Sequence, residues 1–252
     1  MRAEAILFDK DGTFFDFQKT YGGWAGGVIR DYAAGDPVLA AELAEVFGYD
    51  LAAGLFLPDS PVIAGTVLEA AELALPLLPG HSLAALAEDL DRRATALRPV
   101  EVLPLAPFLD ELRAGGLALG VATNDSEAAA RAQLAGFGIE ERFDYIAGYD
   151  SGFGAKPGPG MCLAFAERLG LAPRRIAMVG DSLHDLHAGR AAGMQCVAVL
   201  TGPACAGELA PFADAVLSDI GQLTRWVRTG VSSGQDSPVT RIEQPEQERP
   251  EP

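Results

Sequence analysis

The chain has 252 residues, of which 49% are hydrophobic and 21% charged, and its formal net charge is −16. This length allows one large domain or a core with a smaller domain, and the composition is ordinary for a soluble globular protein. The acidic balance, without any basic stripe, argues against nucleic acids and anionic membranes as partners.

The cysteines and the lengths of the apolar runs bear on where in the cell the protein is located. The three cysteines form no CxxC pair and are typical of reduced thiols. No apolar run approaches the roughly 20 residues that cross a bilayer. A cleaved signal sequence would remove the acidic residues near the N-terminus, so we expect a cytoplasmic protein. The oligomeric state stays open.

The first apolar run, Ala5–Phe8, predicts a buried strand that stops at the sequence DKDGT, residues 9–13. Residues 17–99 then show helical spacing and little strand character. The expected helices in this segment include Val38–Phe47, Val67–Leu77 and Ser82–Leu97. We therefore expect an all-helical insertion after the first strand.

From residue 100 onward, apolar runs alternate with helical segments. The further expected strands are Leu117–Ala122, Tyr145–Gly148, Ile176–Val179 and Cys196–Leu200, and Ala215–Leu217 is a candidate for a sixth. The expected helices are Glu127–Leu134, Pro159–Leu169 and Leu183–Ala192. This alternation predicts an α/β fold with a doubly wound parallel sheet.

These patterns divide the chain into three parts. Residues 1–16 and 100–230 form the predicted core, and residues 17–99 form the insertion. Residues 231–252 are rich in Pro, Glu and Gln, and we expect this tail to be disordered.

Reactive side chains follow the predicted strands at four places. They are Asp9 and Asp11, Thr123 and Asn124, Lys156, and Asp181 and Asp185. Carboxyl ends of parallel strands meet at one sheet edge, where open α/β folds bind ligands. Acidic groups gathered there need a cation, and Mg²⁺ prefers oxygen ligands from one or two carboxylates together with substrate oxygens. The sequence therefore predicts a metal-dependent site.

Phosphoryl transfer fits these residues, because its catalysis consists mainly of positioning and charge neutralisation. Asp9 can attack phosphorus once a metal ion reduces the charge repulsion. Asp11 lies two residues further on, points the same way, and can act as general acid. Lys156 supplies a compact positive charge, and Thr123 supplies a hydroxyl donor.

The metal ligands follow from the same arrangement. Asp9 and Asp181 supply carboxylates, and Asp11 supplies a carbonyl oxygen. Asp185 lies one helical turn after Asp181 and would hold waters of the metal ion.

In order and spacing, these motifs resemble those of the haloacid dehalogenase superfamily, and specifically its phosphatases. The DxDGT of that family matches residues 9–13, its Ser/Thr matches Thr123, its lysine matches Lys156, and its GDSxxD matches residues 180–185. The resemblance implies a Rossmann-like core, Mg²⁺ and an aspartyl-phosphate at Asp9.

The insertion resembles the cap of the subgroup that acts on small phosphorylated metabolites, which includes phosphoglycolate phosphatase and β-phosphoglucomutase. The phosphate contacts expected on this basis are Gly12, Thr13, Thr123, Asn124 and Lys156.

Three features depart from the family pattern. Lys10 stands between the two catalytic acids, where an apolar residue is common. Residues 14–17 read FFDF instead of Leu-x-Asp-Ser. The insertion has few cations, which argues against a highly anionic substrate. These cations are Lys19, Arg30, Arg92, Arg93 and Arg98.

Four functions compete. The first is a phosphatase, with phosphoglycolate as a substrate suggested by the resemblance alone. The second is a phosphomutase, which the apolar loop Leu57–Ile63 disfavours. The third is a dehalogenase, for which the second acid, Asp11, has no use. The fourth is a receiver-like switch, which would be about half this size and would have no cap.

Several residues also have simpler structural roles. Asp181 can cap a helix, and Asp185 can be a solvated surface group. His184 and His187 match no zinc ligand spacing and are expected to be exposed. For three aromatic residues, packing in the core competes with lining the mouth of the site. They are Phe14, Trp24 and Phe56.

Overall fold

A computed structural model describes residues 2–229, so the predicted tail lies outside the described residues. The strands of the main sheet are β1 (Ala5–Phe8), β4 (Ala118–Ala122), β5 (Tyr145–Ala147), β6 (Ile176–Gly180), β7 (Gln195–Val199) and β8 (Ala215–Leu217). The helices that accompany them are α5 (Leu105–Ala114), α6 (Glu127–Gly136), α7 (Gly160–Leu169), α8 (Leu183–Ala192), α9 (Ala206–Leu209) and α10 (Leu223–Thr229). Each predicted strand forms, with ends shifted by at most one residue.

The six strands form one sheet in the order β5-β4-β1-β6-β7-β8, and every neighbouring pair is parallel. The chain runs outward from β1 through β4 to β5, and then returns to β6 on the other side of β1. The predicted doubly wound α/β fold is therefore confirmed. The order reverses between β1 and β6, and open α/β sheets bind ligands beyond the carboxyl ends of strands at such a point.

Side chains alternate across the sheet, and helices cover both faces. In β1, Ile6 and Phe8 pack in a buried cluster with residues of α5 and α10. Ala5 and Leu7 face the opposite side, where they pack with residues of α7 and α8. Because both faces are buried, β1 reads as a continuous apolar run.

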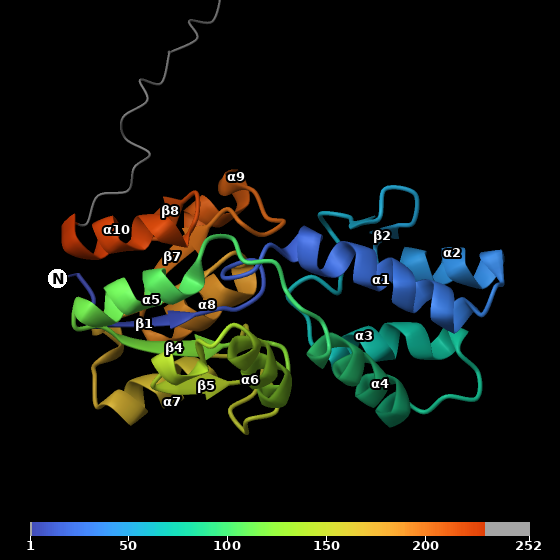
Figure 1. Cartoon of the computed structure of the whole chain (residues 1–252), viewed down its shortest axis with the longest axis horizontal. Helices are drawn as coiled ribbons and strands as arrows, with labels where there is room; N and C mark the ends of the chain where they lie inside the picture. The colour runs from blue at the N-terminus through green and yellow to red at the C-terminus, as the bar shows by residue number, and fades with distance from the viewer. Residues whose placement is uncertain (1, 230–252) are drawn as a thin grey trace, which may run out of the picture.

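Residues 17–97 fold beside this sheet, near the carboxyl end of β1 (Figure 1). Their elements are α1 (Phe17–Ala33), α2 (Pro37–Val46), β2 (Tyr49–Asp50), β3 (Leu55–Phe56), α3 (Val67–Ala74) and α4 (Leu83–Thr95). They have an apolar core of their own, in which Ile29, Leu43 and Leu86 are almost completely buried. We call this segment the inserted lobe.

The helices of the inserted lobe begin at polar capping residues. Asp36 caps α2 by accepting hydrogen bonds from the backbone, and Ser82 caps α4 in the same way. Thr66 and Glu69 form a reciprocal capping box at the start of α3. The antiparallel hairpin β2–β3 is a difference from the expected all-helical insertion. Strands of two residues are too short to show an alternating pattern in the sequence.

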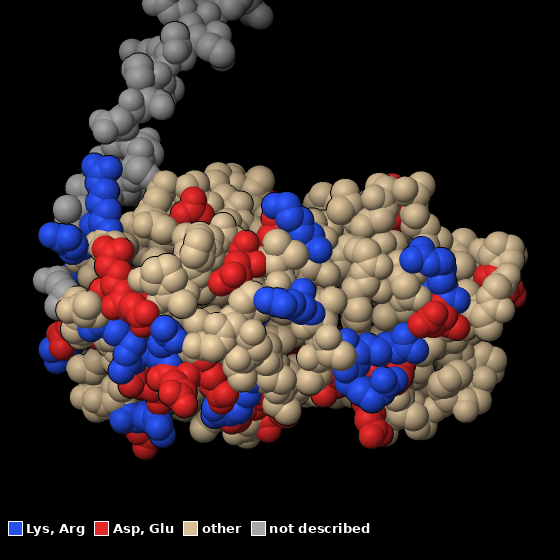
Figure 2. Space-filling view, in the orientation of Figure 1, with Lys and Arg blue, Asp and Glu red and all other residues tan. Residues whose placement is uncertain are grey.

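Two surface observations complete the description. Across residues 2–229, none of the helices has the length and apolar character needed to cross a membrane. On the face drawn in Figure 2, acidic and basic side chains are interspersed, and no extended basic area forms there.

Candidate active site

Three carboxylates come together where the strand order reverses. Asp9 follows β1, Asp181 follows β6, and Asp185 lies in the first turn of α8. Each offers an oxygen, and these oxygens lie within 4.8 Å of one another. All three residues are buried. The simpler role of Asp185 as a solvated surface residue is therefore wrong.

A glycine after β1 allows this close approach. Gly12 has a φ of +79°, and a Cβ atom there would lie 2.2 Å from Oδ2 of Asp181. Any larger residue would therefore clash with that carboxylate. The hydroxyl of Thr201 holds the turn by donating a hydrogen bond to the Gly12 carbonyl oxygen at 2.6 Å.

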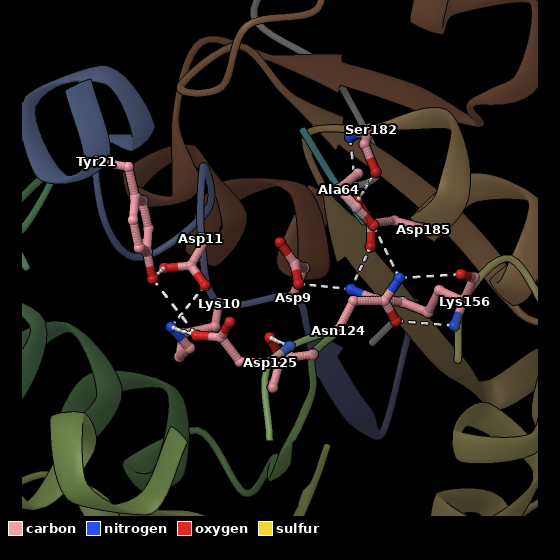
Figure 3. Close-up of polar contacts among 11 residues, drawn as sticks. Asp9, Lys10, Asp11, Tyr21, Ala64, Asn124, Asp125, Lys156, Ser182 and Asp185 are labelled. Carbon is pink, nitrogen blue, oxygen red and sulfur yellow. Dashed lines mark hydrogen bonds and ion pairs between the residues drawn. The ribbon is translucent and has the colours of Figure 1, made fainter. Parts of the chain in front are cut away.

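Lys156 joins two of these carboxylates (Figure 3). Its Nζ lies 2.5 Å from Oδ1 of Asp9 and 2.6 Å from Oδ1 of Asp185. The other oxygen of Asp185 accepts hydrogen bonds from the backbone and the hydroxyl of Ser182. Asp185 therefore positions the lysine and caps α8 at the same time.

Asn124 holds the backbone of Lys156 in place. Its Oδ1 accepts a hydrogen bond from the Lys156 N–H, and its Nδ2 donates to the Lys156 carbonyl oxygen, both at 2.9 Å. The same Nδ2 also donates to the carbonyl oxygen of Ala64 in the inserted lobe, at 2.8 Å. Asn124 thus contacts both lobes.

Burial makes this cluster unfavourable as a set of free carboxylates. Burial raises the pKa of Asp9 to about 7, with the Asp185 charge adding to the effect and the Lys156 ammonium opposing it. Burial and the Asp9 charge raise the pKa of Asp181 well above its usual value. A divalent cation would remove this penalty. Buried, mutually close carboxylate oxygens are a donor set that suits Mg²⁺.

Asp11 belongs to a second polar cluster, outside the group of three carboxylates. Its Oδ2 accepts from Nζ of Lys10 at 2.5 Å, and its Oδ1 accepts from the Tyr21 hydroxyl at 3.1 Å. Nζ of Lys10 also pairs with Oδ2 of Asp125 at 2.9 Å. Burial raises the pKa of Asp11 to about 6, although the Lys10 charge opposes this rise.

Lys10 is fully buried and links this cluster to the inserted lobe. Burial alone would lower its pKa, but the carboxylates of Asp11 and Asp125 outweigh that effect and raise it. Lys10 also donates a hydrogen bond to Gln133 at 2.5 Å, and Gln133 donates to the carbonyl oxygen of Ala94 in α4. Lys10 therefore pairs with two carboxylates of the core and, through Gln133, is linked to the inserted lobe.

The two clusters border a cavity of about 130 Å³ between the lobes. Its floor consists of core residues, namely Asp9, Asp11, Thr123, Asn124, Asp125, Lys156, Asp181 and Ser182. The other lining residues come from the inserted lobe, which forms the roof. The predicted catalytic residues therefore share one cavity.

The remaining predictions have mixed outcomes. Thr123 is buried on the floor, and its hydroxyl accepts a hydrogen bond from the Asp125 N–H at 3.1 Å. Gly12 and Thr13 do not line the cavity, and their expected phosphate contacts stay predictions. The Thr13 hydroxyl is buried and has no hydrogen-bond partner among the described residues.

The aromatic residues divide between the two roles considered for them. Trp24 and Phe56 line the cavity, whereas Phe14 is fully buried in the main core. His187 is exposed and His184 is partly exposed. Sequence reasoning missed Tyr21 and Gln133, because neither residue belongs to a motif. The one signal in the sequence is the unusual Lys10, because a lysine in that position, once buried, requires hydrogen-bond partners from elsewhere in the chain.

Comparisons with a family model and with known proteins agree on one family. Residues 3–193 match the model of the haloacid dehalogenase-like hydrolases. The fructose-1-phosphate phosphatase YqaB of Escherichia coli is 30% identical over 200 residues, which are 79% of this chain and 97% of that protein. The phosphoglycolate phosphatase of Escherichia coli is 37% identical over 98 residues. That match spans 39% of each protein's length.

The fold has solved counterparts as well. A β-phosphoglucomutase from Clostridium difficile superimposes with a TM-score of 0.63, covering 90% of this chain and 96% of that one. At 18% sequence identity, this likeness concerns the fold alone.

Proposed function

The chain belongs to the haloacid dehalogenase-like hydrolases, and from that membership we propose that it is a Mg²⁺-dependent phosphatase acting on a small organic phosphate monoester. The observation that carries the proposal is the position of Asp9. Its carboxylate lies on the cavity floor, 2.5 Å from the ammonium group of Lys156 and within reach of Asp181. Relatives named as phosphatases support the same reaction class.

The first chemical step is a transfer to Asp9. A carboxylate oxygen of Asp9 attacks phosphorus, the bond from phosphorus to the alcohol oxygen breaks, and an aspartyl-phosphate forms. Asp11 donates a proton to the departing oxygen, so that a neutral alcohol leaves. Its pKa of about 6 keeps part of the population protonated near neutral pH.

The second step regenerates the enzyme. Asp11, now ionised, accepts a proton from water as the water oxygen attacks phosphorus, and the bond to Asp9 breaks to release inorganic phosphate. Lys156 holds the Asp9 carboxylate in both steps, while Thr123 and Asn124 border the same floor. Mg²⁺, held by Asp9, Asp181 and the Asp11 carbonyl with Asp185 nearby, would neutralise charge on the phosphoryl group.

The other functions fit the cavity less well. A phosphomutase needs polar groups for a sugar, but Val62 and Ile63 bring apolar side chains to the roof. A dehalogenase has no use for a proton donor, yet Asp11 lines the floor and has a raised pKa. A receiver-like switch has no need of a roof over its phosphorylated residue.

The direct test is phosphate release by purified protein with Mg²⁺ from a panel of phosphorylated metabolites, including phosphoglycolate. We expect turnover by the natural protein and none by Asp9→Asn, which preserves shape but removes the nucleophile. Assays for sugar-phosphate interconversion and halide release on the same samples address the alternatives. Substantial turnover by Asp9→Asn contradicts the covalent route.

A further inference from the structure

The roof of the cavity is almost entirely apolar. The inserted lobe contributes side chains from α1, β3, α3 and α4, from the C-terminal end of α2, and from the segment between β3 and α3. The apolar side chains among them include Phe17, Trp24, Phe47, Phe56, Val62 and Ile63. None of these side chains carries a charge that could neutralise one on a substrate that enters beneath them.

Three polar groups of the roof already have partners within the protein. The Tyr21 hydroxyl donates to Asp11, and the Ala64 carbonyl oxygen accepts from Asn124. The Thr66 hydroxyl donates to Glu69 at 3.0 Å and accepts from the Glu69 N–H. A substrate would therefore meet few free hydrogen-bond donors on this side.

The roof also offers no positive charge. Among the described residues that line the cavity, Lys156 is the only cation, and it already pairs with Asp9 and Asp185. Two cations of the inserted lobe are engaged elsewhere. Lys19 pairs with Asp16 on the surface, and Arg93 pairs with Asp31 and Asp89.

A second anionic group on the substrate would therefore be buried without a counter-charge. A buried charge that lacks an ion-pair partner is strongly unfavourable. A sugar would be disfavoured for a related reason, because its hydroxyl groups would leave water without gaining hydrogen bonds. An apolar group, in contrast, gains from leaving water.

Resting on the proposed function, we propose that the preferred substrate is the phosphate monoester of a small, uncharged and largely apolar alcohol or phenol. The phosphoryl group contacts the charged floor, and the leaving group packs against Trp24, Phe56 and Ile63. The cavity between floor and roof is about 130 Å³ and also has to hold the phosphoryl group, which favours a small leaving group.

The test uses a pair of substrates with the same shape. Isobutyl phosphate and phosphoglycolate have the same number of heavy atoms, but an isopropyl group in the first replaces the carboxylate of the second. We expect kcat/KM with Mg²⁺ to be at least about 10-fold higher for isobutyl phosphate, because the carboxylate lacks a partner. Fructose 1-phosphate should also be a poorer substrate than isobutyl phosphate.

A variant with an added charge tests the cause. Ile63 is half-buried on the roof, at the edge of the lobe's apolar core, so Ile63→Arg can place a guanidinium group near the leaving group, and its Tm shows whether the fold is kept. We expect the ratio of kcat/KM for phosphoglycolate to that for isobutyl phosphate to rise at least about 10-fold, mainly through KM. Ile63→Met changes the shape without adding charge, and it should keep the preference for isobutyl phosphate.

The possible outcomes distinguish a failure of the proposed substrate class from a failure of the proposed phosphatase function. Equal or faster turnover of phosphoglycolate by the natural protein overturns the apolar substrate class and leaves the phosphatase assignment intact. An unchanged ratio in Ile63→Arg also counts against it. Failure to release phosphate from any compound overturns the proposed function, and the substrate class falls with it.

Discussion

The floor and the roof of the cavity differ in composition and in origin. The floor is charged and comes from the loops that follow β1, β4, β5 and β6. The roof is apolar and comes from the inserted lobe. We infer that the floor determines which bond is broken, and that the roof determines which molecule carries that bond. If so, changes to the two surfaces should have different kinetic signatures.

The two surfaces are joined at a few polar contacts. Tyr21 reaches from the roof to Asp11, Asn124 reaches from the floor to the Ala64 carbonyl, and Gln133 bonds to Ala94. Through these contacts, a change in the roof can also affect the catalytic groups of the floor.

The largest effect is expected from removing the acid on the floor. Asp11→Asn should lower kcat for alkyl phosphates by about 10²- to 10⁴-fold, because the alkoxide would leave without a proton. The loss should be much smaller for 4-nitrophenyl phosphate, whose leaving group needs no proton. Steady-state kinetics with both substrates measure the difference.

Asp125→Asn provides the matched control for this prediction, since Asp125 shares Lys10 with Asp11 but has no proposed proton transfer. It should show no such dependence on the leaving group. An equal loss for both substrates in Asp11→Asn would falsify the role of Asp11 as general acid.

The second prediction concerns the buried lysine beneath the floor. Lys10→Met should lower the free energy of unfolding by about 3–5 kcal/mol, because Asp11 and Asp125 lose the ammonium group that they share. Urea unfolding monitored by circular dichroism measures this loss. Lys19→Met removes an exposed lysine paired with Asp16 and should cost at most about 1 kcal/mol. Similar costs for the two variants would show that Lys10 contributes little.

The third prediction is a pH dependence that belongs to the floor alone. The pKa of Asp9 is about 7 in the folded protein, against 3.8 as its ordinary value. Between these values the folded state binds more protons than the unfolded state, so the free energy of unfolding falls as pH rises. The slope reaches at most about 1.4 kcal/mol per pH unit for each extra proton.

Thermal unfolding between pH 5 and 8, with a chelator or with Mg²⁺, tests this dependence. Without the metal ion, Tm should decrease toward pH 8. Mg²⁺ should raise Tm most near pH 8, where Asp9 is ionised. Asp9→Asn should make the metal-free profile less steep, and the raised pKa values of Asp11 and Asp181 account for the slope that remains. A Tm that rises with pH in the chelator would contradict the proton balance at this site.

The floor was largely predictable from the sequence because short motifs encode it. Parallel strands in register place residues that directly follow β1 and β6 side by side, so Asp9 and Asp181 were expected to meet. The burial of Asp185 was not predictable, since it depends on the contact with Lys156, 29 positions earlier in the chain.

The roof was not predictable at the same level. Helical spacing identified α2, α3 and α4, but it did not show which apolar side chains face the cavity and which face the lobe's own core. Leu90 and Leu86 of α4 illustrate the point, because Leu90 lines the cavity whereas Leu86 does not and is buried in the lobe's own core. That choice depends on how the lobes pack, which no local pattern records.

The smallest effect, and the sharpest test of the division, is expected at Tyr21. This roof residue donates to Asp11 at 3.1 Å and lies 3.4 Å from Oδ2 of Asp125. Tyr21→Phe removes only the hydroxyl, and it should cost about 1 kcal/mol of stability and lower kcat a few-fold while KM changes little. Tyr49→Phe removes a comparable bond to the Gly22 carbonyl oxygen, inside the inserted lobe and away from Asp11. It should cost similar stability and leave kcat unchanged, so a loss of kcat in Tyr21→Phe alone would show that the roof helps to position the acid. Equal kcat in both variants would mean that the floor positions Asp11 without help.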